Sequence, residues 1–221
     1  MKKTFIFFLT FCMLLLLGGC GSGDSADIQT PDSPPVQSAE DGNSEETPNT
    51  VPNGADTSDD GVPQAAVVYF SGTGNTADVA ENLAQVLDIP VYALQPEEPY
   101  TDEDLNYRNE DCRANQEMRD EAARPALVTD QMDLDDYDTI YLGYPIWSGN
   151  APRIINTFLE SFDLSGKEIY TFCTSGGSGI EQSVRNLQNL YPDIQIVSGQ
   201  RFSPGASQEE LQTWVDELRE E

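Results

Sequence analysis

Residues 67–80 constrain the fold of this chain more than any other stretch, because a strand, a tight loop and a helix follow one another there without a gap. Residues 67–70 are apolar, residues 71–76 are small or polar, and a helix-forming run follows. A loop of this kind turns several backbone N–H groups and the positive end of a helix toward one point. Hydroxyl groups can add donors there, from Ser71, Thr73 and Thr76. The stretch therefore predicts an anion site at the carboxyl end of a buried strand.

The rest of the chain continues this alternation of strands and helices. We expect the first strand at residues 65–70 and further strands at 90–94, 139–144, 167–173 and 194–197. We expect helices at 75–88, 152–161, 180–190 and from Ser207 on, with two helical pieces between 101 and 123. The central strands are continuous apolar runs, which is typical of a parallel sheet buried on both faces. Of the two common strand orders, 2-1-3-4-5 brings the loops after strands one and three together. The prediction is an α/β three-layer sandwich with five parallel strands in this order and helices on both faces.

The N-terminal residues 1–19 have the pattern of a secretory signal: a basic start, an apolar run and a small-residue exit. The sequence Leu17-Gly18-Gly19-Cys20 resembles the lipobox of bacterial lipoproteins, which implies a lipidated Cys20 as the mature N-terminus. The alternative is an uncleaved membrane anchor, although about 16 apolar residues fall short of the roughly 20 that span a bilayer. Both interpretations place the protein at a cell membrane, on its extracytoplasmic face.

Residues 20–62 form an acidic segment without aromatic residues, lysine or arginine. Ten acidic residues lie there among serine, proline, glycine, threonine and asparagine. Such a composition buries too little apolar surface to offset the entropy of ordering, so we expect a disordered tether. Residues 63–221 are long enough for one domain with a single core.

The charge and composition of residues 63–221 exclude several classes of function. Of the 39 acidic residues 29 lie here, against nine of the 11 basic ones, a formal charge of −20. This charge disfavours nucleic acid and suits a basic protein partner, although simple solubility explains it as well. The chain has no histidine, which removes histidine-based triads and most zinc sites. We therefore expect no metal and no acid–base catalyst, and we expect Cys112 and Cys173 to be separate buried thiols.

Two other phosphate-binding motifs compete for the first loop. A Walker loop requires lysine after its last glycine, and here Asn75 follows Gly74. Residues 72–77 do fit the dinucleotide pattern Gly-x-Gly-x-x-Gly/Ala, with Glu97 at a suitable distance. However, Glu97 follows Pro96 in a turn, and three hydroxyls suit a terminal phosphate better than a pyrophosphate. A mononucleotide is favoured, with the dinucleotide as a competitor.

Two more polar loops follow strands three and four, at residues 145–151 and 174–179. None of the three loops contains lysine or arginine, so an anion would be held by neutral donors alone. Trp147 lies in the second loop, where an aromatic side chain usually has a surface to cover. A planar heterocycle on Trp147, with its phosphate in the first loop, would fill the crevice between them. The alternative is that Trp147 folds back into the core.

These three motifs in order resemble the flavodoxin-like FMN-binding family: Ser-Gly-Thr-Gly-Asn-Thr, Gly-Tyr-Pro-Ile-Trp and Thr-Ser-Gly-Gly-Ser-Gly. The match is best to a bacterial subfamily that also carries Pro-Tyr-Thr-x-x-Asp-Leu-Asn, here residues 99–106, and a later Arg-Pro, here 124–125. The resemblance spans about residues 65–205 and implies a flavodoxin-like fold. It implies that the first loop holds the FMN phosphate through Ser71, Gly72, Thr73, Gly74, Asn75 and Thr76. It implies that one side of the flavin ring lies against Pro145, Ile146, Trp147, Ser148 and Gly149. It implies that the other side is bordered by Thr174, Ser175, Gly176, Gly177, Ser178 and Gly179.

One departure from the subfamily concerns the flavin ring. Ser148 stands where the subfamily usually has a second tryptophan, and the third loop has no aromatic residue. The resemblance implies an electron carrier for a redox partner protein, and the lipobox-like sequence implies that it is tethered to the membrane. Two alternatives remain open: an FMN-dependent NAD(P)H oxidoreductase that reduces a quinone or another small-molecule acceptor, and a binding module without flavin.

Overall fold

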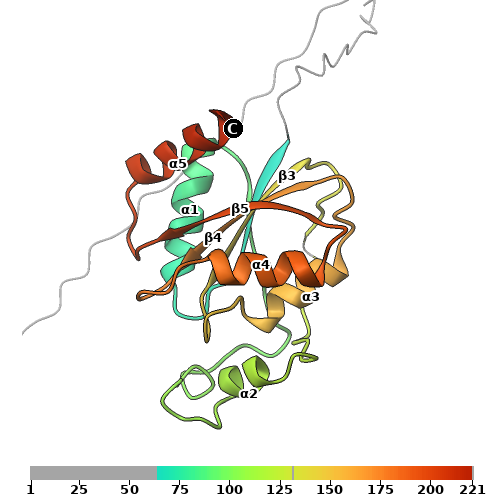
Figure 1. Cartoon of the computed structure of the whole chain (residues 1–221), viewed down its shortest axis with the longest axis vertical. Helices are drawn as coiled ribbons and strands as arrows, with labels where there is room; N and C mark the ends of the chain where they lie inside the picture. The colour runs from blue at the N-terminus through green and yellow to red at the C-terminus, as the bar shows by residue number, and fades with distance from the viewer. Residues whose placement is uncertain (1–63, 131, 221) are drawn as a thin grey trace, which may run out of the picture. The chain divides into compact units, whose positions relative to one another are not determined.

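The computed structural model describes residues 64–130 and 132–220, which form one parallel sheet with helices on both faces (Figure 1). The sheet order is β2-β1-β3-β4-β5, and every pair of neighbouring strands is parallel. The strands are β1 (Ala65–Tyr69), β2 (Val91–Ala93), β3 (Thr139–Pro145), β4 (Glu168–Thr174) and β5 (Gln195–Phe202). The predicted fold class and strand order are confirmed. The expected signal segment, Cys20 and the tether lie outside the described residues.

Four helices form the two outer layers of the sandwich (Figure 1). One layer consists of α1 (Asn75–Leu87) and α5 (Gln208–Glu220), and the other of α3 (Arg153–Ser161) and α4 (Glu181–Leu190). The short helix α2 (Arg113–Arg119) lies outside both layers, beyond the carboxyl ends of the strands. None of the helices in the described part of the chain has the length and apolar character to cross a bilayer.

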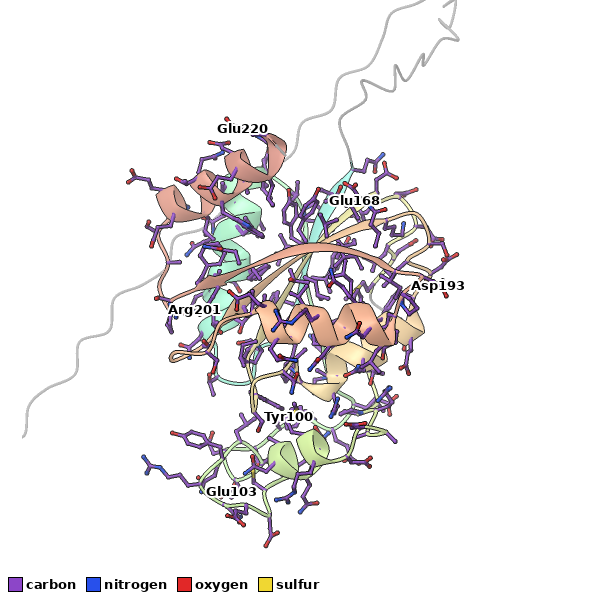
Figure 2. All side chains as sticks on the ribbon, viewed as in Figure 1. Tyr100, Glu103, Glu168, Asp193, Arg201 and Glu220 are labelled. Atoms are coloured by element: carbon purple, nitrogen blue, oxygen red, sulfur yellow. The ribbon has the colours of Figure 1, made fainter. Side chains whose placement is uncertain are left out.

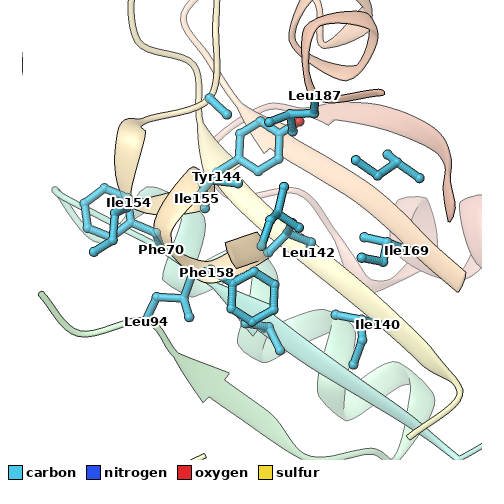
Figure 3. Close-up of a cluster of buried hydrophobic side chains, with 14 of the residues drawn as sticks. Phe70, Leu94, Ile140, Leu142, Tyr144, Ile154, Ile155, Phe158, Ile169 and Leu187 are labelled. Atoms are coloured by element: carbon cyan, nitrogen blue, oxygen red, sulfur yellow. The ribbon is translucent and has the colours of Figure 1, made fainter. Parts of the chain in front are cut away.

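The alternation of side chains along each central strand builds one apolar core on each face of the sheet. On β3, Ile140, Leu142 and Tyr144 point into the core beneath α3 and α4 (Figure 3). Tyr141 points into the opposite core, where it meets Trp214 of α5. Because both faces are covered, residues 140–144 in the middle of β3 are all buried and carry no charged side chain, which explains the continuous apolar run.

The region between residues 101 and 123 differs from the two helical pieces that we expected. Its only helix is α2, of seven residues. Thr101 and Asp104 do exchange the hydrogen bonds of a capping box, at 2.9 and 3.2 Å. This exchange closes turns instead of starting a helix, because the residues that follow lack an apolar face that a helix could bury.

Strand β5 is longer than the expected 194–197 and continues to Phe202. Its second half is polar, so its sequence resembles a loop. The backbone of β5 nevertheless pairs with β4 along this half, and the last pair is Phe202 of β5 with Thr174 of β4. An edge strand is stabilised by backbone pairing on one side only and tolerates polar residues on its exposed face.

The two cysteines of the domain are separate, as expected. Cys112 and Cys173 are both buried and free. Burial raises the pKa of the Cys173 thiol to about 12, which keeps it protonated at neutral pH.

Candidate functional site

The first loop, Ser71–Thr76, is held closed by its own side chains. The backbone N–H of Gly74 donates to Ser71 Oγ at 3.1 Å, and Asn75 Nδ2 donates to Thr73 Oγ1 at 3.3 Å. In both contacts the hydroxyl oxygen is the acceptor, so the hydroxyl proton remains available. The loop therefore presents two oriented O–H donors before any ligand is bound.

The N-terminus of α1 follows this loop and carries no cap. Its N-cap residue is Gly74, and no side-chain hydrogen bond caps the helix. The first N–H to reach an acceptor within the helix belongs to Asp78, which bonds Gly74 O at 3.0 Å. The preceding N–H groups point out of the first turn with the positive end of the helix dipole. This is the arrangement that binds phosphate groups at the start of a helix.

Thr76 connects the first loop with the third. It is buried, and its hydroxyl lies 2.8 Å from the hydroxyl of Thr174 at the end of β4. Either oxygen can be the donor, so the pair has one proton left for another acceptor. The contact fixes the two loop bases relative to each other.

The second loop is a two-residue hairpin at the end of β3. Trp147 and Asn150 exchange two backbone hydrogen bonds of 2.9 Å. The residues between them, Ser148 and Gly149, have φ angles of 48° and 81°. Positive φ at both central positions is the requirement of a type I′ turn, which glycine meets most easily. The N–H of Ile146 also donates to Thr174 O at 3.0 Å, which ties this loop to β4.

The Trp147 ring combines the two roles that the sequence left open. It is half-buried, and it makes T-shaped ring contacts with Phe70 and Tyr100, whose ring centroids lie 5.6 and 5.5 Å away. The same side chain lines an open pocket of about 470 Å³. The ring is thus oriented by the edge of the core while it remains accessible on the pocket side.

This pocket brings the first and second loops together. The first loop contributes Gly72, Thr73 and Thr76, and the second contributes residues 145–148. The remaining wall comes from the β2–β3 segment, residues 97–126, which contains α2. It contributes Leu105, Tyr107, Ala114, Asn115 and Met118. The volume lies in the range of small-molecule and cofactor sites, and the lining mixes apolar walls with a few polar groups.

The third loop is not part of the pocket lining. Thr174 is buried and bonded to Thr76, while residues 176–179 are exposed. The Ser175 hydroxyl donates to the Ser178 carbonyl, and Arg201 Nη1 donates to Ser175 O at 3.4 Å. Residues 175–179 stay a sequence-based prediction for the cofactor. Arg201 adds a cation beside this loop that comes from β5 and not from the loop itself.

Sequence reasoning missed the wall that the β2–β3 segment supplies. The segment is polar and lies about 30 residues away from both loops along the chain. The only signal was the Pro-Tyr-Thr-x-x-Asp-Leu-Asn sequence, which ends one residue before Tyr107. Nothing in that sequence says that the segment folds over the ends of the strands.

A half-buried charged cluster of Tyr100, Arg113 and Glu117 attaches the segment beside Trp147, and Figure 2 labels Tyr100 at this place. Tyr100 donates its hydroxyl proton to Glu117 Oε2 at 2.5 Å, and Arg113 Nε donates to Oε1 at 2.7 Å. The Arg113 guanidinium also lies over the Tyr100 ring, 4.1 Å from its centroid. Burial and the Glu117 carboxylate raise the pKa of Tyr100, so its hydroxyl stays a donor. Burial opposes the charge of Arg113, but the hydrogen bond to Glu117 together with the attraction of nearby acidic groups outweighs it and raises the arginine pKa.

The comparisons with known proteins match the same part of the chain that forms the domain. The sequence profile of the Flavodoxin family matches residues 64–218. The chain belongs to this family. A search of curated proteins found no match.

Solved structures of other flavodoxin-like chains cover the same region. A Bacteroides uniformis protein assigned as a flavoprotein is 43% identical, with a TM-score of 0.67, over 70% of this chain and 98% of its own. One from Bacteroides eggerthii is 38% identical, with a TM-score of 0.68, over 72% and 99%. A Lactobacillus acidophilus flavoprotein in complex with FMN is 22% identical, with a TM-score of 0.57, over 70% and 99%. This last similarity shows the fold alone.

Proposed function

We propose that the domain binds FMN and transfers electrons to or from a redox partner, as a lipoprotein tethered to the extracytoplasmic face of a cell membrane. The observation that carries the proposal is the pairing of an uncapped, hydroxyl-lined helix start with a pocket walled by Trp147. The first binds a phosphate, and the second accommodates a flat ring. Family membership and the FMN complex of the Lactobacillus acidophilus flavoprotein support the same cofactor.

The residues of the first loop would hold the phosphate, and those of the second would orient the ring. FMN, when bound, supplies the electron transfer. Thr73 and Ser71 donate hydroxyl protons to the phosphate, and the first-turn N–H groups of α1 complete its shell. Trp147, fixed by Phe70 and Tyr100, covers one side of the ring and excludes water from it. No lysine or arginine of the loops takes part, so the phosphate is bound by neutral donors.

An FMN titration tests the site. The full-length chain, purified in detergent, is expected to bind one FMN per chain, read from the shift in flavin absorbance. Thr73→Val removes one hydroxyl. It is expected to weaken FMN binding on the order of tenfold, because hydrogen bonds to charged groups contribute about 1.5–3 kcal/mol. Thr213→Val is the matched control, since that exposed hydroxyl bonds only Glu209 O in its own helix. A protein that stays colourless with added FMN contradicts the proposal and selects a flavin-free binding module.

Stepwise reduction separates the electron carrier from the enzyme. A carrier is expected to keep its oxidised spectrum with NADPH until a reductase is added. Bleaching by NADPH alone, followed by quinone reduction, would instead identify the alternative function, an FMN-dependent NAD(P)H oxidoreductase.

The membrane tether rests on the sequence around Cys20 and has its own test. Cys20→Ser is expected to abolish incorporation of labelled fatty acid and to release the protein from the membrane fraction. Accessibility of the domain to protease added outside intact cells tests its side of the membrane.

A further inference from the structure

We propose that Tyr107 is the second aromatic wall of the pocket and stacks on the flavin ring that Trp147 contacts. The inference rests on the proposed function and adds to it a contact from the β2–β3 segment. Tyr107 and Trp147 line the same 470 Å³ pocket, although they come from different elements. The third loop of the sheet provides no aromatic side chain.

Tyr107 is unusually exposed for an aromatic residue. Its relative exposure is 76%, the highest among the exposed large hydrophobic residues of the described chain. Its ring makes none of the ring–ring contacts found within residues 64–130 and 132–220, whereas Trp147 has two and Tyr100 has two. An exposed aromatic side chain at the rim of a pocket has apolar surface to bury against a ligand.

The backbone of Tyr107 is nevertheless fixed. Its N–H donates to Leu105 O at 2.8 Å, and its carbonyl accepts from Asn115 Nδ2 at 3.1 Å. The same Asn115 amide donates to Asn109 O at 2.8 Å, so one side chain of α2 holds both ends of the turn. A ring on a fixed backbone can meet a ligand without ordering the loop at the moment of binding, which lowers the entropic cost.

The surroundings of Tyr107 favour a flat apolar ligand over a protein partner. Leu105, Ala114 and Met118 form the wall beside it, and Trp147 lies in the same pocket. A concave apolar lining with a few polar groups is the form of a small-molecule site. A flavin ring between Tyr107 and Trp147 would have an aromatic contact on both faces, although the third loop, residues 174–179, has no aromatic side chain to provide one.

Flavin titrations of the full-length chain test this contact. Tyr107→Leu removes the aromatic ring, Tyr107→Phe keeps it, and Leu190→Ala changes an exposed apolar residue of α4 that does not line this pocket. Aromatic stacking supports a loss on the order of tenfold in FMN affinity for Tyr107→Leu. We expect the bound flavin to become more fluorescent as well, because aromatic contacts quench it. Tyr107→Phe and Leu190→Ala are expected to match the wild type.

Riboflavin, which lacks the phosphate, distinguishes the ring contact from the phosphate site. Tyr107→Leu is expected to weaken the binding of riboflavin by the same factor as the binding of FMN, whereas Thr73→Val is expected to weaken the binding of FMN only. Unchanged affinity and fluorescence in Tyr107→Leu overturn the inference while leaving FMN binding intact. An equal loss in Tyr107→Phe also overturns it, because the hydroxyl and not the ring would then be responsible. A wild type that binds no flavin removes the proposed function and this inference together.

Discussion

At the residue scale, Gly143 shows how closely the sheet is packed. A Cβ atom at this position would lie 2.2 Å from the Phe172 ring on the neighbouring strand. The Phe172 side chain projects from β4 into the core, where its ring contacts the rings of Phe202 and Trp214. Strand β3 carries the second loop, so crowding here would also disturb the position of Trp147.

We expect Gly143→Ala to destabilise the domain by about 1–3 kcal/mol, the usual range for overpacking a core. Gly176→Ala is the matched control, since an added Cβ there meets nothing within 4 Å, and its stability is expected to be unchanged. Urea unfolding measures both. The double variant Gly143→Ala with Phe172→Leu is expected to lose less than the sum of the single changes, and strict additivity would argue against the clash.

Tyr144 makes the stability of the domain depend on pH in the alkaline range. Its burial raises the pKa to about 12, against opposing hydrogen bonds from Ser183 and Thr171, while the unfolded value is 10.0. A raised folded pKa means that the contribution is complete below pH 10 and is lost as the pH rises toward 12. Stability is therefore expected to fall by about 2–3 kcal/mol over this range on account of Tyr144. Urea unfolding at several pH values checks this, because Tyr144→Phe should flatten the fall in stability between pH 10 and 12, and an unchanged fall would contradict the role of Tyr144.

At the scale of elements, the β2–β3 segment depends on a few polar anchors instead of a core of its own. Glu117 accepts from Tyr100 and Arg113, and Arg153 of α3 donates to Met118 O at 3.1 Å. Thr157 of α3 also donates to Pro125 O at 2.9 Å. Segments held this way open locally before the whole domain unfolds.

We expect Glu117→Ala to loosen the segment while changing the global stability by only about 1 kcal/mol. The variant leaves the Tyr100 hydroxyl and the Arg113 guanidinium without their shared acceptor, and hydrogen bonds to charged groups are worth about 1.5–3 kcal/mol locally. Proteolysis within residues 97–126 is expected to accelerate on the order of tenfold. Glu103→Ala, at an exposed position of the same segment, serves as control (Figure 2). Equal cleavage rates in the two variants would rule out the anchor.

The elements that the sequence predicted well are those with a repeated apolar pattern. Strands β1, β3 and β4 read as buried because both faces of the sheet are covered, and Ser207 with Glu210 forms the expected capping box of α5 at 2.8 and 3.2 Å. The second half of β5 and the turns after Thr101 were predicted wrongly. In β5 the backbone pairing with β4 decides the conformation, and in the turns the local bonds between Thr101 and Asp104 do; neither follows from an apolar pattern.

At the scale of the whole molecule, the candidate site could be predicted only in part. The strand order placed the first and second loops side by side, because parallel strands end at one edge of the sheet. The third wall, with Leu105 and Tyr107, comes from a segment whose path depends on anchors such as Glu117. Such long-range contacts between polar residues have no periodicity, so a single sequence does not reveal them.

The net charge of the domain lowers its stability at low salt. Residues 63–221 carry a formal charge of −20, so the folded state repels itself. Raising sodium chloride from about 10 to about 100 mM shortens the Debye length from about 30 to about 10 Å. The melting temperature is expected to rise by about 2–4 °C per kcal/mol of repulsion removed. Sucrose of equal osmolality is the control, and an equal rise in sucrose would exclude screening as the cause.

The same salt series separates the two kinds of electron acceptor that the proposed function allows, a basic protein and a small molecule. Electrostatic attraction between an acidic surface and a basic protein partner speeds association, and this advantage falls steeply with ionic strength. Electron transfer to such a partner is therefore expected to slow between about 10 and about 100 mM salt. A neutral quinone feels no such attraction, so its reduction rate should stay constant across the series. Stopped-flow measurement of flavin reoxidation with each acceptor distinguishes them, and a salt-independent rate with a basic partner protein would contradict a role of the acidic surface in docking.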